Sequence, residues 1–142
     1  MPFSSLSDAS VIGTLVALGV GLLIGIERER RKADPHFGGA GGVRTHVIVA
    51  LAGALAMQFP GFGLVVVGGV FVAALVLLAY ARDRSPDIGI TSEITLFTTY
   101  LLGAVATLAP ELAAAVGVVI ALLLALRKPL HRLAAMQRFA QR

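Results

Sequence analysis

Apolar residues occur along this 142-residue chain in five long runs that short polar segments separate. A helix of roughly 20 apolar residues crosses the hydrocarbon core of a bilayer. The pattern therefore predicts an all-α membrane protein with a five-span transmembrane domain over residues 1–127, followed by a basic, weakly amphipathic cytoplasmic tail over residues 128–142. The predicted spans cover about 10–26, 44–59, 62–81, 91–109 and 111–127, with very tight turns at Pro60-Gly61 and Pro110-Glu111.

The composition agrees with a membrane protein and excludes several classes of function. Hydrophobic residues make up 57% of the chain and charged residues only 14%, whereas soluble domains carry about 25% charge. A soluble enzyme, a nucleic-acid-binding domain and a disulfide scaffold are therefore not expected, the last because the chain has no cysteine. No serine or cysteine nucleophile stands near a histidine and a carboxylate in a familiar order, so we expect no enzyme.

The basic residues indicate the orientation in the membrane. The amino terminus and the two tight turns contain no lysine or arginine. By the positive-inside rule, the amino terminus lies outside and the carboxyl terminus lies in the cytoplasm. The charge run from Glu27 to Lys32 is then a topology determinant with ion pairs such as Glu27 with Arg31. The first loop holds Arg28, Arg30, Arg31, Lys32 and Arg44; the third holds Arg82 and Arg84; the tail holds Arg127, Lys128, Arg132, Arg138 and Arg142.

Two segments of the chain can be laid over each other in the same order. Residues 42–47 match 89–94, residues 51–56 match 101–106, and Pro60 falls on Pro110. This suggests a parallel duplication of helical hairpins, formed by spans 2–3 and 4–5, with an axis along the membrane normal. Arg44 and His46 would then face Thr91 and Glu93. The alternative is that helices rich in small residues resemble one another by composition.

Small residues recur every four positions along the first span and form a smooth ridge for helix packing. The ridge consists of Gly13, Ala17, Gly21 and Gly25. Its partner is either a hairpin of the same chain or the same ridge of a second copy. Because five thin helices enclose little by themselves, a homo-oligomer is expected.

Glu93 is the strongest candidate for chemistry, because a carboxylate near the start of an apolar span is costly and is by default a functional-site hypothesis. In a purely structural role, with Thr91 as N-cap, Glu93 lies in the first helical turn, where the helix dipole favours an anion by about 0.3–1 kcal/mol. In a functional role, Glu93 and Glu27 bind a cation at the cytoplasmic ends of their spans, or relay protons, and Arg44 pairs with both when the site is empty. Thr91, Ser92 and Thr95 supply further oxygen atoms, which suit Mg²⁺.

A glycine-rich loop that runs into the second span is a candidate anion site. Backbone N–H groups at such a corner, with a basic residue beside them, can bind phosphate or a lipid headgroup. The glycine spacing is not that of a P-loop, and glycines at such a corner also permit a close-packed turn. The residues concerned are Gly41, Gly42, Arg44 and Thr45, with Arg28 as a second basic group.

Three segments resemble the membrane domain of the MgtC/SapB family. They are residues 25–30 (GIERER), 41–46 (GGVRTH) and 51–54 (LAGA), and residues 87–95 (DIGITSEIT) are similar to the branch with a second membrane domain. The resemblance implies a multi-pass protein of the bacterial inner membrane, associated with growth at low magnesium. It places the family motif on Glu27, Arg28, Arg44 and Thr45.

Two functions follow from the resemblance and the residues together. The first is transport or homeostasis of Mg²⁺ or another cation through Glu93 and Glu27, where the resemblance alone favours Mg²⁺ and no other cofactor is expected. The second is a non-transporting regulator that binds another membrane protein, such as the F-type ATP synthase, through the glycine ridge. The expected partners are the lipid bilayer and a second copy, and either a second membrane protein or a further domain; no nucleic acid is expected.

Overall fold

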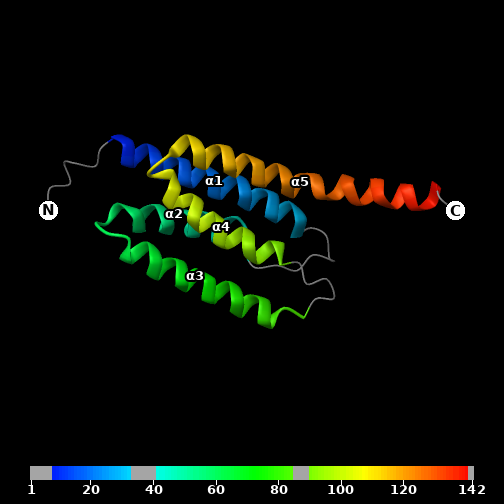
Figure 1. Ribbon diagram of the computed structural model, residues 1–142, viewed down its shortest axis with the longest axis horizontal. Helices are drawn as coiled ribbons and strands as arrows, with labels where there is room; N and C mark the ends of the chain where they lie inside the picture. Colours follow the sequence, from blue (N-terminus) through cyan, green and yellow to red (C-terminus); the bar gives the residue numbers. More distant parts are fainter. Residues whose placement is uncertain (1–7, 33–40, 85–89, 141–142) are drawn as a thin grey trace.

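The computed structural model describes residues 8–32, 41–84 and 90–140, and these residues form five α-helices and no strand (Figure 1). The prediction of an all-α chain with five helices is confirmed. The helices are α1 (Asp8–Lys32), α2 (Val43–Gln58), α3 (Gly63–Arg82), α4 (Thr91–Ala106) and α5 (Pro110–Ala140).

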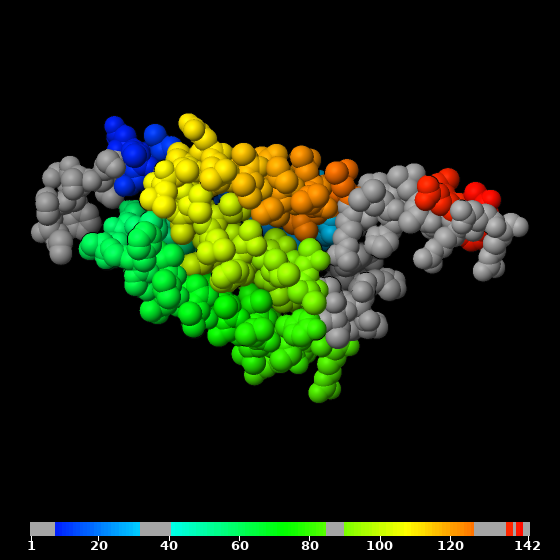
Figure 2. Space-filling view, in the orientation of Figure 1, coloured from blue at the N-terminus to red at the C-terminus, as the bar shows by residue number. Residues whose placement is uncertain are grey.

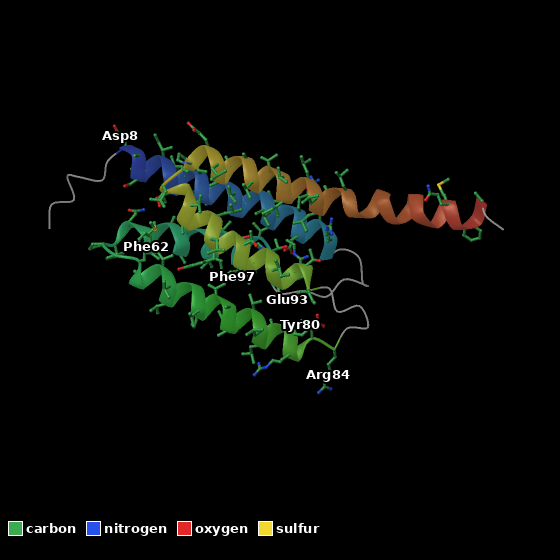
Figure 3. The ribbon with its side chains drawn as sticks, viewed as in Figure 1. Asp8, Phe62, Tyr80, Arg84, Glu93 and Phe97 are labelled. Carbon is green, nitrogen blue, oxygen red and sulfur yellow. The ribbon has the colours of Figure 1, made fainter. Side chains whose placement is uncertain are left out.

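Successive helices run in opposite directions (Figure 1). The carboxyl ends of α1 and α3 therefore lie beside the amino ends of α2 and α4, and α5 passes this end and projects beyond it. Figure 3 shows Tyr80, Arg84 and Glu93 at this end, with Asp8 and Phe62 at the other. We call it the basic end, because several arginines lie on the helix ends that meet there or just after α3, namely Arg28, Arg30, Arg31, Arg44, Arg82 and Arg84.

The inner helix of the bundle is α4, which contacts each of the other four helices. The outer helix is α3. Within the described residues it packs on α2 and α4 alone, and Val72 is its one buried residue. The space-filling view shows α3 as a separate layer along one side (Figure 2). A helix that is apolar all round and yet exposed requires an apolar environment.

By length and composition, two helical segments could cross a membrane, residues 8–31 and Gly63–Arg82. Two further apolar segments, Val43–Gln58 and Pro110–Leu126, are shorter. At a rise of about 1.5 Å per residue, the 16 residues of α2 or α4 extend over only about 24 Å. This length is less than the thickness of the hydrocarbon core of a bilayer, which is about 30 Å.

The small-residue ridge of α1 packs inside the chain, which decides between the two partners left open by the sequence. A Cβ atom on Gly21 would lie 2.9 Å from the Cα of Val47, and one on Gly25 would lie 2.7 Å from the Cα of Val43. Gly13 is equally close to the end of α4, and Ala17 is fully buried in the core. The ridge is therefore covered mainly by α2.

A second close contact joins α2 to α4. A Cβ atom on Gly53 would meet the carbonyl oxygen of Tyr100, and one on Gly103 would meet the carbonyl oxygen of Ala50. In the alignment of residues 51–56 with 101–106, Gly53 corresponds to Gly103, and the same offset pairs Ala50 with Tyr100. Exchanging α2 and α4 therefore exchanges the two contacts. In the described residues the exchange does not extend to the whole hairpins, because α3 packs on α4 whereas α5 does not contact α2, so the duplication of hairpins stays a prediction.

Two helix boundaries differ from the sequence-based expectation. The residue before α4 is Ile90, which provides no side-chain cap, so Thr91 is the first helical residue and not the N-cap. The last helix, α5, continues through Pro129 to Ala140 without a separate tail element. Although proline removes one helical hydrogen bond, this single loss does not end the helix here.

Candidate functional site

The buried polar side chains of the described residues gather in the half of the bundle toward the basic end. They come from three mutually packed helices, α1, α2 and α4. We call this group the polar cluster; it consists of Arg28, Arg31, His46, Ser92, Glu93, Thr95 and Thr99. Because buried polar groups are costly unless they are bound, this end is the candidate functional site.

Glu93 lies in the first turn of α4 and is 5% exposed. Its Oε2 atom accepts no hydrogen bond from the residues that the structure describes. Buried polar atoms nearly always have a partner, so an exception calls for an explanation such as an unseen ion or water. The prediction that Glu93 is a carboxylate inside the bundle agrees with this placement.

Hydroxyl groups follow Glu93 along the same helix. The Thr95 hydroxyl donates to the carbonyl oxygen of Thr91 at 2.5 Å, and the Thr99 hydroxyl donates to the carbonyl oxygen of Thr95 at 2.7 Å. Because each proton points back along the helix, the oxygen lone pairs stay available to accept a hydrogen bond or bind a cation. Ser92 is also buried, whereas Thr91 is exposed.

His46 belongs to the polar cluster although the sequence did not single it out as a site residue; Arg31 and Thr99 are two others of this kind. It is fully buried, and its Nδ1 atom lies 3.0 Å from the carbonyl oxygen of Gly42. Because a carbonyl oxygen only accepts, the Nδ1 atom carries the hydrogen of this bond. In the alignment of residues 42–47 with 89–94, His46 corresponds to Glu93, and this position could have identified it as a site residue.

Two arginines of α1 are buried, each 7% exposed. Arg28 follows Gly21 and Gly25 at helical spacing, so it continues the stripe of α1 that packs on α2. Arg31 instead lines a groove with Ala125 of α5. The sequence analysis named Arg28 as a basic group of the site but not Arg31.

The MgtC family model matches residues 14–133 of this chain. The chain belongs to the MgtC family. No curated protein and no solved structure matches it. The family is one of membrane proteins, and membership indicates a role in magnesium homeostasis. The matched region begins within α1, ends within α5 and includes every residue of the polar cluster.

One ion pair and one exposed arginine characterise the basic end of this MgtC-family chain. Glu27 pairs with Arg30, with Oε1 and Nη1 3.6 Å apart, and the expected pair of Glu27 with Arg31 stays a prediction. Arg44 is exposed, and among the residues that the structure describes it forms no ion pair with Glu27 or Glu93. The reason is that Arg44 projects from the outer side of α2, away from the side on which His46 is buried.

The structure does not assemble a ligand set for a metal ion from protein carboxylates alone. In the described ranges, no three histidine, aspartate or glutamate residues lie close enough to hold a metal. Glu27 lines the groove between α1 and α5, whereas Glu93 belongs to the inner helix. The assignment of both as metal ligands stays a prediction.

The glycine-rich loop is described only in part, because residues 33–40 lie outside the described residues. Gly41 has a φ of 79°, a left-handed conformation that favours glycine. Gly42 is the N-cap of α2 and provides no side chain to cap it. Thr45 packs against Gly41, since a Cβ there would lie 2.9 Å from the Cβ of Thr45. Gly41 therefore has a conformational role, and anion binding at this corner stays a prediction.

Proposed function

We propose that this chain is a five-span protein of the bacterial inner membrane that binds and transports a cation, foremost Mg²⁺, at a cytoplasmic site centred on Glu93. The alternating helix directions support five spans with the amino terminus outside (Figure 1). The basic end then faces the cytoplasm, because the first and third loops carry the arginines and the two tight turns carry none.

The burial of Glu93 with an unsatisfied Oε2 atom is the observation that carries the proposal. A cation would satisfy that oxygen, and Ser92 and Thr95 offer further oxygen atoms on the same turn of α4. Because Mg²⁺ usually keeps several of its waters and takes only one or two protein carboxylates, a single buried carboxylate is enough to bind a partly hydrated ion.

The buried arginines determine how tightly such an ion is held. We assign to Arg28, rather than to the exposed Arg44, the role of balancing the charge of Glu93 when the ion is absent. A neighbouring guanidinium weakens the binding of a cation. Weak binding suits transport, because an ion must leave its site as readily as it enters.

Magnesium flux into liposomes that contain the purified chain tests the proposal. The wild type is compared with Glu93→Gln under an imposed membrane potential, and a dye inside the vesicles reports Mg²⁺. Glu111→Gln is the matched control, because Glu111 also lies in the first turn of a helix but is exposed at the opposite end. We expect the flux to be lost in Glu93→Gln and kept in Glu111→Gln. Equal flux in both variants would place the site elsewhere, and no flux from folded wild type would exclude transport by this chain alone.

The exposed surface of α3 favours a second candidate, a non-transporting regulator that binds another membrane protein. This helix leaves most of its large apolar side chains exposed, among them Val67 and Phe71. The glycine ridge of α1, the surface first considered for this role, is covered by α2. On this alternative, Glu93→Gln leaves growth at low magnesium unchanged, and a photo-crosslinker at Phe71 captures a membrane partner that one at the equally exposed Leu15 does not.

A further inference from the structure

The last helix extends well beyond the rest of the bundle. α5 has 31 residues, but the apolar part of its sequence ends at Leu126, where Arg127 and Lys128 follow. Residues 127–140 therefore reach about 21 Å further, at about 1.5 Å per residue. We call them the projecting part of α5. Figure 1 shows this part past the basic end, with no other described helix beside it. In the proposed orientation it stands in the cytoplasm.

Large apolar side chains of the projecting part are open to water. Met136 is 70% exposed and Phe139 is 85% exposed. In the membrane such side chains contact lipid, but the projecting part lies outside the hydrocarbon core. A single helix of about 12–15 residues is also only marginally stable in water. Packing against a second apolar surface would stabilise this part of α5 and cover its apolar residues.

The apolar positions of the projecting part follow a heptad repeat. Steps of three and four residues from Leu126 meet apolar residues alone, as the a and d positions of a coiled coil do. The same steps backward reach Leu122 and Val119, which are each 54% exposed, whereas Leu124 on the other side of α5 is buried in the bundle. One stripe thus continues from the membrane part into the projecting part. We call its last positions the α5 stripe; they are Leu126, Pro129, Leu133, Met136 and Ala140.

The charged residues of the projecting part all avoid this stripe. In the membrane part an apolar stripe says little, because nearly every residue is apolar. In the projecting part five of the residues are basic and none is acidic, yet no basic residue occupies an a or d position at about 100° per residue. A second copy can therefore pair along the stripe while the basic residues of both copies stay on the outside. These basic residues are Arg127, Lys128, His131, Arg132 and Arg138.

The membrane restricts how two copies can meet. Copies that insert in the same orientation are related by a two-fold axis along the membrane normal, since oligomers of identical chains are usually symmetric. The two α5 helices then run parallel, and each position of the α5 stripe faces the same position of the other copy. This is the geometry of a parallel two-stranded coiled coil.

We propose that this chain forms a homodimer in which the projecting parts of α5 pair along the α5 stripe as a parallel two-stranded coiled coil. A second copy is favoured over an anionic membrane surface, because α5 continues through Pro129 without a break and does not turn aside (Figure 1). It is favoured over an acidic protein, because such a partner would bind the basic side and leave Met136 uncovered. The inference rests on the proposed membrane orientation but not on ion transport.

Disulfide trapping in vesicles tests the pairing directly, because the chain has no cysteine of its own. Met136→Cys places a cysteine at a d position, where it faces its own copy at a distance that suits a disulfide. Arg138→Cys is the matched control, two residues later and about 200° round the helix. The vesicles consist of phosphatidylcholine, with and without phosphatidylglycerol. We expect Met136→Cys to be trapped mostly as a dimer in both lipids, and Arg138→Cys to stay mostly monomeric.

Sedimentation equilibrium in detergent measures the strength of the association. Met136→Glu and Arg138→Gln both lower the net charge of the chain by one, but only the first puts a charge into the α5 stripe. Because a charge between apolar residues is costly, Met136→Glu should weaken the dimer by about tenfold or more. Arg138→Gln should leave the dimer at least as stable as that of the wild type.

Several results would overturn the proposal. A wild type that sediments as a monomer at every protein-to-detergent ratio shows no dimer. Equal disulfide yields at the two positions, or a dimer that Met136→Glu does not weaken, would show that the copies meet elsewhere. A polarity-sensitive dye on Met136→Cys that enters lipid only when phosphatidylglycerol is present would mean that the membrane covers the stripe. Magnesium flux plays no part in these outcomes, so the two proposals fail separately.

Discussion

The close contact between α2 and α4 predicts that a single methyl group added at the crossing lowers the stability of the protein. In Gly103→Ala the added Cβ would overlap the carbonyl oxygen of Ala50. A backbone atom cannot rotate away as the end of a long side chain can, so the two helices must separate. Overpacking of this kind costs about 1–3 kcal/mol, and helix association in membranes depends on such close approach.

A second glycine-to-alanine substitution serves as a control. It separates the effect of the helix crossing on stability from the intrinsic effect of replacing glycine in a helix. Gly19 also lies within a helix, and no atom is within 4 Å of the position of its missing Cβ. Both replacements by alanine gain about 1 kcal/mol of helix propensity, and this gain cancels in the comparison. We therefore expect Gly103→Ala to be less stable than Gly19→Ala by about 1–3 kcal/mol, which corresponds to a roughly 5- to 150-fold larger unfolding constant.

The free energy of unfolding can be measured by titrating the protein in mixed micelles with sodium dodecyl sulfate. Loss of helix is followed by circular dichroism, because the chain has no tryptophan to serve as a fluorescent probe. If Gly103→Ala proves as stable as Gly19→Ala, then α2 and α4 do not meet at Gly103, and the crossing described above is wrong.

Three other predictions use the same protein. Tyr100→Phe removes the hydroxyl that donates to the carbonyl oxygen of Val65 at 2.9 Å, and should lower the free energy of unfolding by about 0.5–1.5 kcal/mol in the same titration; an unchanged value would show that α3 is not held by this bond. Nitrogen-15 NMR, with the other two histidines replaced, should find the neutral ring of His46 protonated at Nδ1, and a ring protonated at Nε2 would contradict the assigned hydrogen bond. Gly21→Leu should drive α1 away from Val47 and prevent stable folding, whereas a folded but inactive variant would mean that the ridge faces another molecule.

Much of the fold could be predicted because it depends on local properties of the chain. The apolar runs gave the five helices in order, and Pro60 and Pro110 lie at or next to the turns that were expected. The end of α5 was harder to predict from the sequence. A proline such as Pro129 normally breaks a helix, whereas α5 continues through it without a break. The N-cap of α4 was placed one residue too late, since Thr91 is a good N-cap by type but is already the first residue of the helix, after Ile90.

Only part of the candidate site could be predicted from the sequence. Glu93 was identified because a carboxylate in an apolar span stands out by itself. Arg44 was expected to pair with Glu93, but the rotation of α2 exposes Arg44 and buries His46 instead. Arg28 could have been distinguished from Arg30 by its spacing from Gly21 and Gly25, which places it on the packed face of α1.

By itself, the sequence determined that this is an all-helical chain of the MgtC type with an apolar exterior and one strongly basic end. These properties depend on composition and on the order of residues, which act through local helix formation and partition between water and lipid. Only the tertiary structure decided that the ridge of α1 packs on α2, that Gly53 and Gly103 form the crossing, and that His46 joins the polar cluster. Those facts depend on the rotation of each helix about its own axis and on the angle at which it crosses its neighbours, which are set by the packing of all five helices together.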